Sequence, residues 1–316
     1  METATLITGG LGFIGLNLLK FIKADRIIVV DNFKCAGSIR HINKHILFLE
    51  GDVTDKKFVR MLSIYPINKI YHLASIASPK FYKKFPIDTI MTNVIGTLNI
   101  CELALTCKAR LLLSSTSEIY GQPEVHPQPE SYFGHRNTVG DRSCYDCSKA
   151  VAETIVYEYT KKGLNAVIAR IFNTYGPYMR PDDGRVISEF ICRAIIGKPL
   201  IIHNGGNQTR SFCYVDDLCK GLILLMEKGK DLVYNVGNDQ AEITINQLAD
   251  LIEARLNKKL ERKYIDVQDN DPVVRRPDLT KIRQLGYKPQ VEIEQGLRKT
   301  IKYFRKQWTG KTFKEY

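Results

Sequence analysis

Short apolar runs alternate with amphipathic stretches along the first 120 residues. Continuous runs rich in β-branched side chains, each bounded by turn residues, occupy residues 5–8, 26–31, 46–53, 69–75 and 110–117. Such runs are typical of strands buried on both faces of a parallel sheet. Between them, residues 15–22 and 93–105 carry apolar side chains at three- and four-residue spacing, which predicts helices. This alternation predicts βαβ units and a doubly wound sheet.

The pattern continues beyond residue 120 without an internal repeat, a low-complexity tract or an evident linker. We predict a helix over about 146–162, a strand at 165–172 and, after a passage rich in Pro and Gly, another sheet strand at 232–237. A sheet strand so late in the chain implies that the C-terminal part is interleaved with the first domain.

Composition narrows the class of protein. The chain has 316 residues, of which 44% are apolar and 25% charged, and these ordinary globular values exclude collagen-like and disordered proteins. No apolar run approaches the roughly 18–20 residues that span a bilayer, and the start METATLITGG lacks the basic region of a signal peptide. Eight cysteines without framework spacing indicate reduced thiols. We therefore expect a cytoplasmic protein with no membrane partner.

The net charge of +12 raises the question of a polyanionic partner. Residues 251–316 hold 17 Lys and Arg against 9 Asp and Glu, and so carry +8 of the excess. The basic residues fall at helical spacing around LRKTIKYFRKQW, with no aromatic interleaving or nucleic-acid motif. We interpret them as the solvated face of a helix and expect no nucleic-acid partner.

A glycine-rich turn follows the first predicted strand and opens a helix. Gly9, Gly12 and Gly15 in TGGLGFIG allow a tight turn, a close backbone approach to a pyrophosphate, and helix-on-strand packing. Asp31 ends the second strand 22 residues after Gly9, where a carboxylate binds the adenosine ribose and favours NAD over NADP. Asp52 and Val53, at the end of the third predicted strand, are placed to contact the adenine. We predict a Rossmann-type doubly wound parallel sheet that binds NAD.

These signals suggest two interleaved domains. We assign residues 1–175 to an NAD-binding Rossmann domain with a returning strand near 232–238. Residues 176–316 then form, in the main, a smaller C-terminal α/β substrate-binding domain.

A Tyr-x-x-x-Lys pair, Tyr145 and Lys149, lies at the start of the helix predicted over about 146–162. The i, i+4 spacing places both side chains on one face, and a cation beside a phenol lowers the phenol pKa from ~10 toward the working pH. The tyrosine is then a general base for a hydroxyl whose carbon loses a hydride. Thr116, Ser117 and Glu118 follow the strand RLLLSS at the carboxyl edge of the sheet. Thr116 would hydrogen-bond the same hydroxyl, and the other two would serve acid–base steps.

The motifs TGGLGFIG, GDVTD, TSEIYG, YDCSK and ARIFNTYGP together resemble the extended short-chain dehydrogenase/reductases that modify nucleotide-linked sugars. Within that family, YHLASIASP, TSEIYGQPEVHPQ, CYDCSKAVAET, DGRVISEFI and QTRSFCYVDDL resemble the UDP-glucuronate decarboxylase (UDP-xylose synthase) subfamily. The resemblance extends from about residue 3 to residue 308.

The resemblance implies NAD-dependent oxidation at C4 of the glucuronosyl ring with Tyr145 as base, loss of CO2 from the resulting β-keto acid, and re-reduction to UDP-xylose. Glu118 and Ser117 would handle the proton at C5, and Arg275 in VVRRP falls where the family has an arginine near the substrate. The implied substrate-binding residues are Asn173, Arg185, Arg210 and Arg275. Pattern and resemblance together give the cofactor-binding residues as Gly9, Gly12, Phe13, Ile14, Gly15, Asp31, Asn32, Asp52, Val53, Leu73, Ser75, Thr92, Tyr145 and Lys149. No metal site is expected.

Four positions depart from the subfamily pattern. Met91 replaces a lysine expected near the sugar acid, and Arg180 stands where a histidine is expected. Lys162 and Gly163 replace a glutamine and a glutamate. The loss of a cation at Met91 weakens the case for glucuronate recognition, although Arg275 could supply that charge.

Other functions remain open at this level. A nucleotide-sugar 4,6-dehydratase or 4-epimerase would use the same first oxidation, but dehydratases usually carry an aspartate at the position of Ser117. A non-catalytic NAD-binding scaffold, or a nucleic-acid binder that uses the basic charge, is the alternative from another class. The intact pair of Tyr145 and Lys149 argues against a scaffold.

Several isolated features carry less information. Cys144 and Cys147 resemble a redox motif only in spacing, and His72 within a strand is interpreted as a packed core residue. His126 and His135 fall in a loop over the site, where a substrate role is open. The helices around NVIGTLNICELAL and AVAETIVYEYTKK have apolar stripes too wide for one buried face. In the resembled family such helices form a four-helix dimer interface, so we predict a homodimer.

Overall fold

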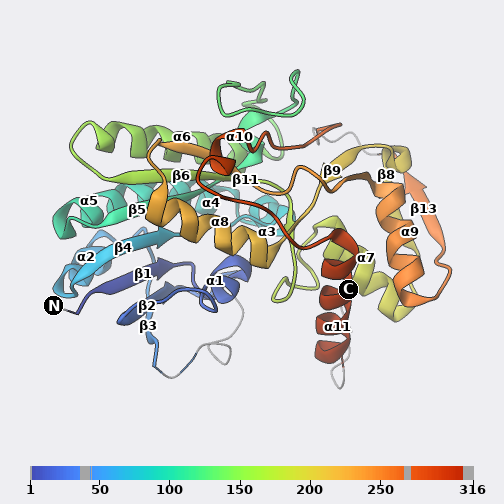
Figure 1. Ribbon diagram of the computed structural model, residues 1–316, viewed down its shortest axis with the longest axis horizontal. Coiled ribbons are helices and arrows are strands. Elements are labelled where there is room, and N and C mark those ends of the chain that lie inside the picture. The colour runs from blue at the N-terminus through green and yellow to red at the C-terminus, as the bar shows by residue number, and fades with distance from the viewer. Residues whose placement is uncertain (1, 36–42, 44, 267–271, 309–316) are drawn as a thin grey trace.

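A seven-stranded parallel sheet forms the centre of the fold in the computed structural model, which describes residues 2–35, 43, 45–266 and 272–308 (Figure 1). The strand order is β11-β6-β5-β4-β1-β2-β3. The strands are β1 (Ala4–Thr8), β2 (Arg26–Asp31), β3 (Leu47–Glu50), β4 (Ile67–His72), β5 (Arg110–Thr116), β6 (Ala166–Ile171) and β11 (Val233–Val236). Every neighbouring pair is parallel. The predicted doubly wound fold is confirmed, because the order reverses between β1 and β4.

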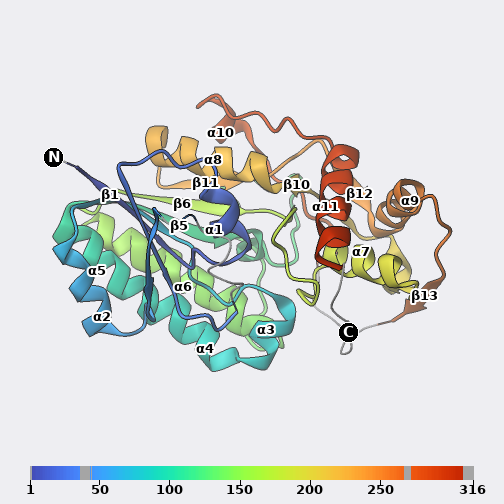
Figure 2. The ribbon, with the colours of Figure 1, turned by 90° about the horizontal axis from the view of Figure 1, so that it is seen from below.

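Helices cover both faces of the sheet (Figure 2). One face packs against α1 (Phe13–Leu18) and α8 (Val215–Lys228), and the other against α2 (Lys56–Met61), α5 (Thr97–Cys107) and α6 (Ser143–Thr160). Neighbouring residues of β1 alternate between these two cores: Leu6 belongs to one and Ile7 to the other, and both are fully buried. This double burial explains why the strands are continuous apolar runs in the sequence.

A long apolar helix crosses one face of the sheet. It consists of α4 (Pro86–Met91), a π-helical turn η3 (Thr92–Gly96) and α5. Pro86–Cys107 is no unbroken apolar run, since it contains Asp88 and Glu102, but by length and composition this 22-residue helix could cross a membrane. The core helices of soluble proteins have the same length and composition. In this protein 44% of the most apolar part of the helix is buried, mainly against α6 and the sheet.

The C-terminal part forms a smaller α/β layer beside the carboxyl ends of the sheet strands (Figure 1). It contains α7 (Val186–Ile196), α9 (Ile245–Leu256) and α11 (Ile293–Trp308). Three short strand pairs support it: β7 (Thr174–Tyr175) with β10 (Cys213–Tyr214), β8 (Leu200–His203) with β13 (Arg262–Ile265), and β9 (Thr209–Ser211) with β12 (Glu242–Thr244). The remaining elements are α3 (Pro79–Lys84), α10 (Thr280–Arg283), η2 (Leu62–Ile64), η4 (Ser117–Tyr120) and η5 (Asn204–Gly206).

The late strand β11 pairs with β6 at the edge of the central sheet, far from its sequence neighbours in the cap. The division at residue 175 stays a prediction.

The basic helix α11 buries Leu297, Ile301 and Phe304. Its exposed residues include Arg298, Lys299, Lys302, Arg305 and Lys306. The charge excess in this helix therefore lies on a solvated face.

Candidate active site

A cavity of about 1060 Å3 opens between the carboxyl ends of the sheet strands and the C-terminal layer. All the predicted catalytic and substrate-binding residues line it, namely Thr116, Ser117, Glu118, Tyr145, Lys149, Asn173, Arg185, Arg210 and Arg275. Of the predicted cofactor-binding residues, all but Asp52 line it as well. The strand order brings these residues together, because ligands of doubly wound sheets bind at the carboxyl edge near the reversal of strand order.

The glycine turn has no room for side chains. Gly9 has a φ of +68°, and a Cβ there would lie 2.6 Å from the backbone nitrogen of Ala74. A Cβ on Gly15 would lie 2.6 Å from the carbonyl oxygen of Gly10. The turn therefore packs its own backbone tightly and leaves a bare cradle at the cavity wall, which fits a dinucleotide pyrophosphate.

Asp31 closes the second strand beside this turn. Its carboxylate accepts hydrogen bonds from the backbone nitrogens of Leu11 at 3.1 Å and Phe33 at 3.0 Å. Burial raises the pKa of Asp31, and these backbone hydrogen bonds lower it in part. The side chain is thus held in place at the cavity wall, where the ribose of NAD would lie. Lys34 also lines the cavity, toward this end.

Asp52 is not among the residues that line the cavity, although its neighbours Gly51 and Val53 are, and its contact with the adenine stays a prediction. Its carboxylate accepts hydrogen bonds from the Asn32 side chain at 2.8 Å and from the Thr54 backbone nitrogen at 2.8 Å. Burial alone would raise the pKa of Asp52, but these hydrogen bonds and the charge of Lys34 lower it below its ordinary value. Asp52 therefore orients Asn32, which does line the cavity.

Tyr145 and Lys149 project from the first turns of α6, which begins three residues earlier than predicted. Lys149 donates from Nζ to the carbonyl oxygen of Ser114 at 2.8 Å. Burial lowers the pKa of Lys149 to about 7. Burial raises the pKa of Tyr145 to about 12, and a hydrogen bond with Thr116 lowers it in part. Lys149 is not among the main influences on the Tyr145 pKa, which besides burial and Thr116 include the charges of Arg185 and Glu118.

Glu118 lies on η4 between two arginines. Its oxygens accept from Arg275 Nη1 at 2.7 Å and Nη2 at 2.8 Å, and Arg142 Nη2 lies 2.8 Å from Oε2. Burial opposes ionisation, but the two guanidinium groups lower the pKa of Glu118 to about 2. Burial and the charge of Glu118 raise the pKa of neighbouring Asp146. The site therefore holds a fixed carboxylate at the cavity wall.

The predicted substrate-binding side chains are held by contacts within the cavity wall. Arg185 donates to Asp183 at 2.9 Å and to the carbonyl oxygen of Ala77 at 3.0 Å, which joins the cap to the segment after β4. Arg210 is 4% exposed and donates to the carbonyl oxygen of Thr209. The side-chain oxygen of Asn173 is buried with no hydrogen-bond partner in the structure. An unsatisfied buried acceptor at a cavity wall is suited to a ligand's hydroxyl or amide.

Several cavity residues were not predicted from the sequence, and two of them contact the predicted catalytic residues. Arg142 precedes α6 and pairs with Glu118. Tyr82 on α3 stacks on Tyr145, with ring centroids 5.2 Å apart. A signal for Arg142 was its place three residues before the tyrosine of the Tyr-x-x-x-Lys pair, but Tyr82 had no spacing signal.

The departures from the subfamily pattern lie at different distances from the cavity. Arg180 lines it, forms an ion pair with Asp182, and lies 4.9 Å from the ring centre of Phe81. Met91 is 45% exposed and is not among the lining residues. Lys162 and Gly163 are exposed beyond the end of α6.

The other singled-out residues have structural partners. His72 is buried between the hydroxyls of Thr8 and Thr97, and burial lowers its pKa to about 3, so its interpretation as a core residue is confirmed. His126 contacts Glu242, and His135 lies 3.6 Å from Glu124. Neither histidine is among the cavity-lining residues. Cys144 and Cys147 are both free, and burial raises the pKa of each thiol, which disfavours the reactive thiolate.

Comparison with known proteins agrees with this geometry. Residues 5–237 match the NAD dependent epimerase/dehydratase family. UDP-glucuronic acid decarboxylase 3 of Arabidopsis thaliana is 45% identical over 302 residues, covering 92% of this chain and 86% of the relative. UDP-glucuronic acid decarboxylase 1 of Xenopus tropicalis is 45% identical over 315 residues, covering 98% and 74%.

Solved structures show the same fold with ligands. UDP-glucose 4-epimerase from Thermotoga maritima, with UDP-glucose, has a TM-score of 0.90 at 30% identity, covering 96% of this chain and 99% of that chain. DesIV, a dTDP-glucose 4,6-dehydratase from Streptomyces venezuelae with NAD bound, has a TM-score of 0.87 at 26% identity, covering 96% and 97%. The chain therefore belongs to the NAD dependent epimerase/dehydratase family, whose cofactor fits the glycine turn and Asp31 described above.

Proposed function

We propose that the protein converts UDP-glucuronate to UDP-xylose and CO2. The observation that carries the proposal is the 45% identity to UDP-glucuronic acid decarboxylases over 92–98% of the chain. The serine in Thr116-Ser117-Glu118 supports it, because a dehydratase needs an acid there to protonate the leaving 6-hydroxyl.

The cofactor and the protein divide the redox and proton steps. NAD, held by the glycine turn and Asp31, would supply reversible hydride transfer at C4 of the sugar, so there would be no net oxidation. Tyr145 accepts the proton of the C4 hydroxyl, and Thr116 hydrogen-bonds the tyrosine at the end of β5. Since burial raises the pKa of Tyr145 to about 12 in the free protein, deprotonation requires positive charge nearby. Lys149, one helical turn away, is the cation that the chain supplies.

The second stage breaks the C5–C6 bond. A ketone at C4 makes the carboxylate a β-keto acid, so CO2 leaves and the electron pair forms an enolate at C4–C5. Tyr145 donates a hydrogen bond to the enolate oxygen. Ser117 and Glu118 lie on η4 beside the same cavity and position the water or hydroxyl that protonates C5. A carboxylate with a pKa of about 2 is too weak a base for direct proton exchange at neutral pH, so we assign Glu118 an electrostatic and orienting role.

The diphosphate and the uracil would bind where Arg185, Arg210 and Asn173 line the cavity. Arg185 and Arg210 line it and supply fixed guanidinium groups for phosphate oxygens. Asn173 offers its unsatisfied side-chain oxygen to a donor of the ligand. This arrangement gives part of the chain's positive charge a function in binding an anionic substrate.

Product analysis tests the reaction. Purified protein incubated with UDP-glucuronate and NAD+ should release CO2 and yield UDP-xylose by mass spectrometry. A matched incubation with UDP-glucose separates the alternatives: loss of water indicates a 4,6-dehydratase, and UDP-galactose indicates a 4-epimerase. Met91 in place of a lysine and the likeness to the Thermotoga maritima epimerase keep these alternatives in the test. Absence of turnover on UDP-glucuronate would refute the proposal.

We also propose that the protein is a homodimer through α4–α5 and α6. These helices pack against each other, and their outward side chains include the exposed apolar residues Ile87, Ile90, Met91, Val151 and Tyr157. Exposed apolar side chains gathered on helices that pack together are typical of a protein–protein interface. Two helices from each subunit would form a four-helix bundle.

We further propose a reducing, cytoplasmic location without a nucleic-acid or membrane partner. All eight cysteines are free in the structure. The basic residues of α11 form a solvated helical face rather than a groove. Expression with a fluorescent tag would locate the protein, and salt-sensitive binding to random-sequence DNA would contradict the proposed absence of a nucleic-acid partner.

A further inference from the structure

The segment that carries Arg275 has almost no secondary structure of its own. Over residues 272–279 there is one isolated β-bridge, between Gln128 and Pro277. Yet the Arg275 side chain is 6% exposed and makes two hydrogen bonds of 2.7 and 2.8 Å to Glu118. Something outside the segment must therefore fix its backbone, because a bidentate pair requires the guanidinium to be held in one orientation.

Gln128 supplies most of that fixation. Its backbone nitrogen donates to the carbonyl oxygen of Arg276 at 2.9 Å, and its carbonyl oxygen accepts from Asp278 at 2.9 Å. Its side-chain oxygen accepts from the Arg276 nitrogen at 2.8 Å, and its side-chain nitrogen donates to the carbonyl oxygen of Val125 at 2.8 Å. The residue is 1% exposed. Both backbone polar groups of Arg276, the residue after Arg275, are thus bound by Gln128.

The opposite side of the segment is held by β9. Ser211 donates from its backbone nitrogen to the carbonyl oxygen of Arg275 at 3.0 Å. Arg275 therefore lies between two anchors, one on its own carbonyl and one on the following amide. These two groups belong to one planar peptide unit, so β9 holds its carbonyl side and the Gln128 side chain holds its N–H side.

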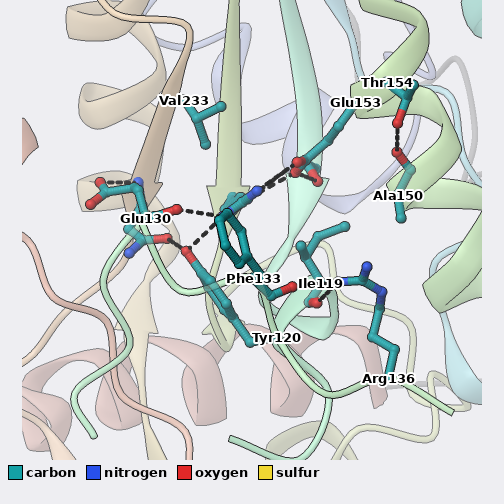
Figure 3. A network of polar contacts seen from close by, with 12 residues as sticks. Ile119, Tyr120, Glu130, Phe133, Arg136, Ala150, Glu153, Thr154 and Val233 are labelled. Atoms are coloured by element: carbon teal, nitrogen blue, oxygen red, sulfur yellow. Dashed lines mark hydrogen bonds and ion pairs between the residues drawn. The ribbon is translucent and has the colours of Figure 1, made fainter. Parts of the chain in front are cut away.

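The same network fixes the other member of the ion pair. Tyr120, two residues after Glu118, donates from its hydroxyl to the side-chain oxygen of Asn235 at 2.7 Å. Asn235 in turn donates to the carbonyl oxygens of Gln128 at 2.9 Å and Asp278 at 3.2 Å. Figure 3 shows Tyr120 within the surrounding polar contacts, which reach Glu130 and Glu153. Glu118 and Arg275 are thus attached to one rigid frame.

We propose that Gln128 is a positioning residue, whose side-chain amide holds the backbone after Arg275 so that the guanidinium stays opposite Glu118 in the cavity. The role that the Arg275–Glu118 pair has in turnover rests on the proposed function. The position of the pair in the cavity is given by the structure and does not depend on the proposed function.

Two substitutions of similar length separate the polar function from packing. Gln128→Met removes both polar atoms and leaves the Arg276 nitrogen unpaired. Gln128→Glu keeps an acceptor for that nitrogen and, when protonated, also a donor for the Val125 carbonyl. We expect kcat to fall about tenfold or more in Gln128→Met, because misplacement of about 1 Å in a catalytic arrangement has effects up to ~100-fold. Gln128→Glu should recover activity as the pH is lowered, while the Kd for NAD+ stays unchanged in both.

Gln122→Met is the matched control. Gln122 accepts from the nitrogen of Val273 at 3.2 Å on the same segment, but the contact is exposed, so water can replace it. Its kcat should stay within about twofold of the wild-type value.

A double-mutant cycle with Arg275→Lys distinguishes positioning from general stabilisation. If Gln128 acts through Arg275, Gln128→Met should lower kcat little further in the Arg275→Lys background. Independent, multiplicative losses would overturn the proposal, as would a wild-type kcat in Gln128→Met. A crystal structure of Gln128→Met provides a readout without substrate: the two short contacts to Glu118 should be lost. If wild-type protein fails to turn over UDP-glucuronate, the proposed function fails and this structural comparison alone decides the role of Gln128; unchanged contacts would then refute it.

Discussion

The rings of Tyr82 and Tyr145 lie parallel, with centroids 5.2 Å apart and planes 8° from each other. The hydroxyl of Tyr82 is buried without a hydrogen-bond partner among the residues that the structure describes, and burial raises its pKa. Tyr82 therefore acts here as a flat apolar support that limits the motion of the Tyr145 ring. The Tyr145 hydroxyl is left to interact with Thr116 and with whatever occupies the cavity.

Tyr145→Phe should abolish most turnover but leave the fold intact. The substitution removes the proposed base and keeps the ring stack, so kcat should fall by about 100-fold or more while the Kd for NAD+ changes little. Tyr82→Phe is the control, because it removes a hydroxyl that has no partner in the structure. It should keep kcat near wild type and a melting temperature equal to wild type or higher. Steady-state kinetics and thermal denaturation check both, and an active Tyr145→Phe variant would contradict the assignment.

The stability of the wild-type fold, relative to a variant without Lys149, should rise with pH. Burial lowers the pKa of Lys149 in the folded state to about 7, whereas an unfolded lysine has a pKa of about 10.4. Between these values the unfolded chain binds the additional proton, so raising the pH favours the folded state. Below pH 7 both states are protonated, and the cost of the buried charge is fully present.

The measurement is the difference in melting temperature between wild type and Lys149→Met at several pH values. We expect wild type to gain on Lys149→Met from pH 7 to about pH 10, with Lys149→Met inactive throughout. Lys302→Met, on the exposed face of α11, is the control and should show a difference independent of pH. If the difference in melting temperature between wild type and Lys149→Met does not change with pH, the lysine keeps its ordinary pKa in the folded protein.

Glu118→Gln should strongly destabilise the protein near neutral pH. It leaves the buried guanidinium groups of Arg275 and Arg142 without their shared carboxylate, and such losses cost about 3–5 kcal/mol. The two arginines lower the pKa of Glu118 to about 2, so its ionisation stabilises the fold above the unfolded pKa of ~4.3. That contribution is lost as the pH falls from ~4.3 toward 2. Urea denaturation of wild type and Glu118→Gln should therefore give free energies of unfolding that converge in acid.

Glu102→Gln provides the contrast. Glu102 pairs with Lys56 at 3.1 Å on the surface, with both side chains over 40% exposed. Its loss should change the free energy of unfolding by about 1 kcal/mol or less at any pH. Equal losses in the two variants would show that burial adds nothing to the Glu118 pair.

The central sheet was predictable from the sequence because strands that are buried on both faces are continuous apolar runs. The strand expected at 26–31 is Arg26–Asp31 in the structure, and the late strand expected at 232–237 is Val233–Val236. The start of the long helix at Pro86 was not recognised, because its first turn is only half apolar. The proline at its first position was an available signal.

The site was predictable where its residues share an element and not where they meet in space. Tyr145 and Lys149 are one turn apart on α6, so their spacing alone places them together. Glu118 and Arg275 are 157 residues apart, and no local pattern reveals that their charges neutralise each other. Both residues were predicted from the sequence as site residues, but Arg275 was expected to bind the substrate carboxylate. In the structure both of its terminal nitrogens donate to Glu118.

A charge on the exposed face of the long helix should break the proposed dimer. Ile87 is 69% exposed at the start of α4, and Tyr157 on α6 is 49% exposed. Ile87→Asp places a carboxylate in the proposed apolar interface, where desolvation opposes association. We expect light scattering after size exclusion to change from about twice 36.0 kDa to the single-chain mass. Phe133→Asp is the control: this side chain is 91% exposed on the loop before α6, outside the proposed interface, and its substitution should leave the mass unchanged. A monomeric wild type, or a dimeric Ile87→Asp, would refute this interface.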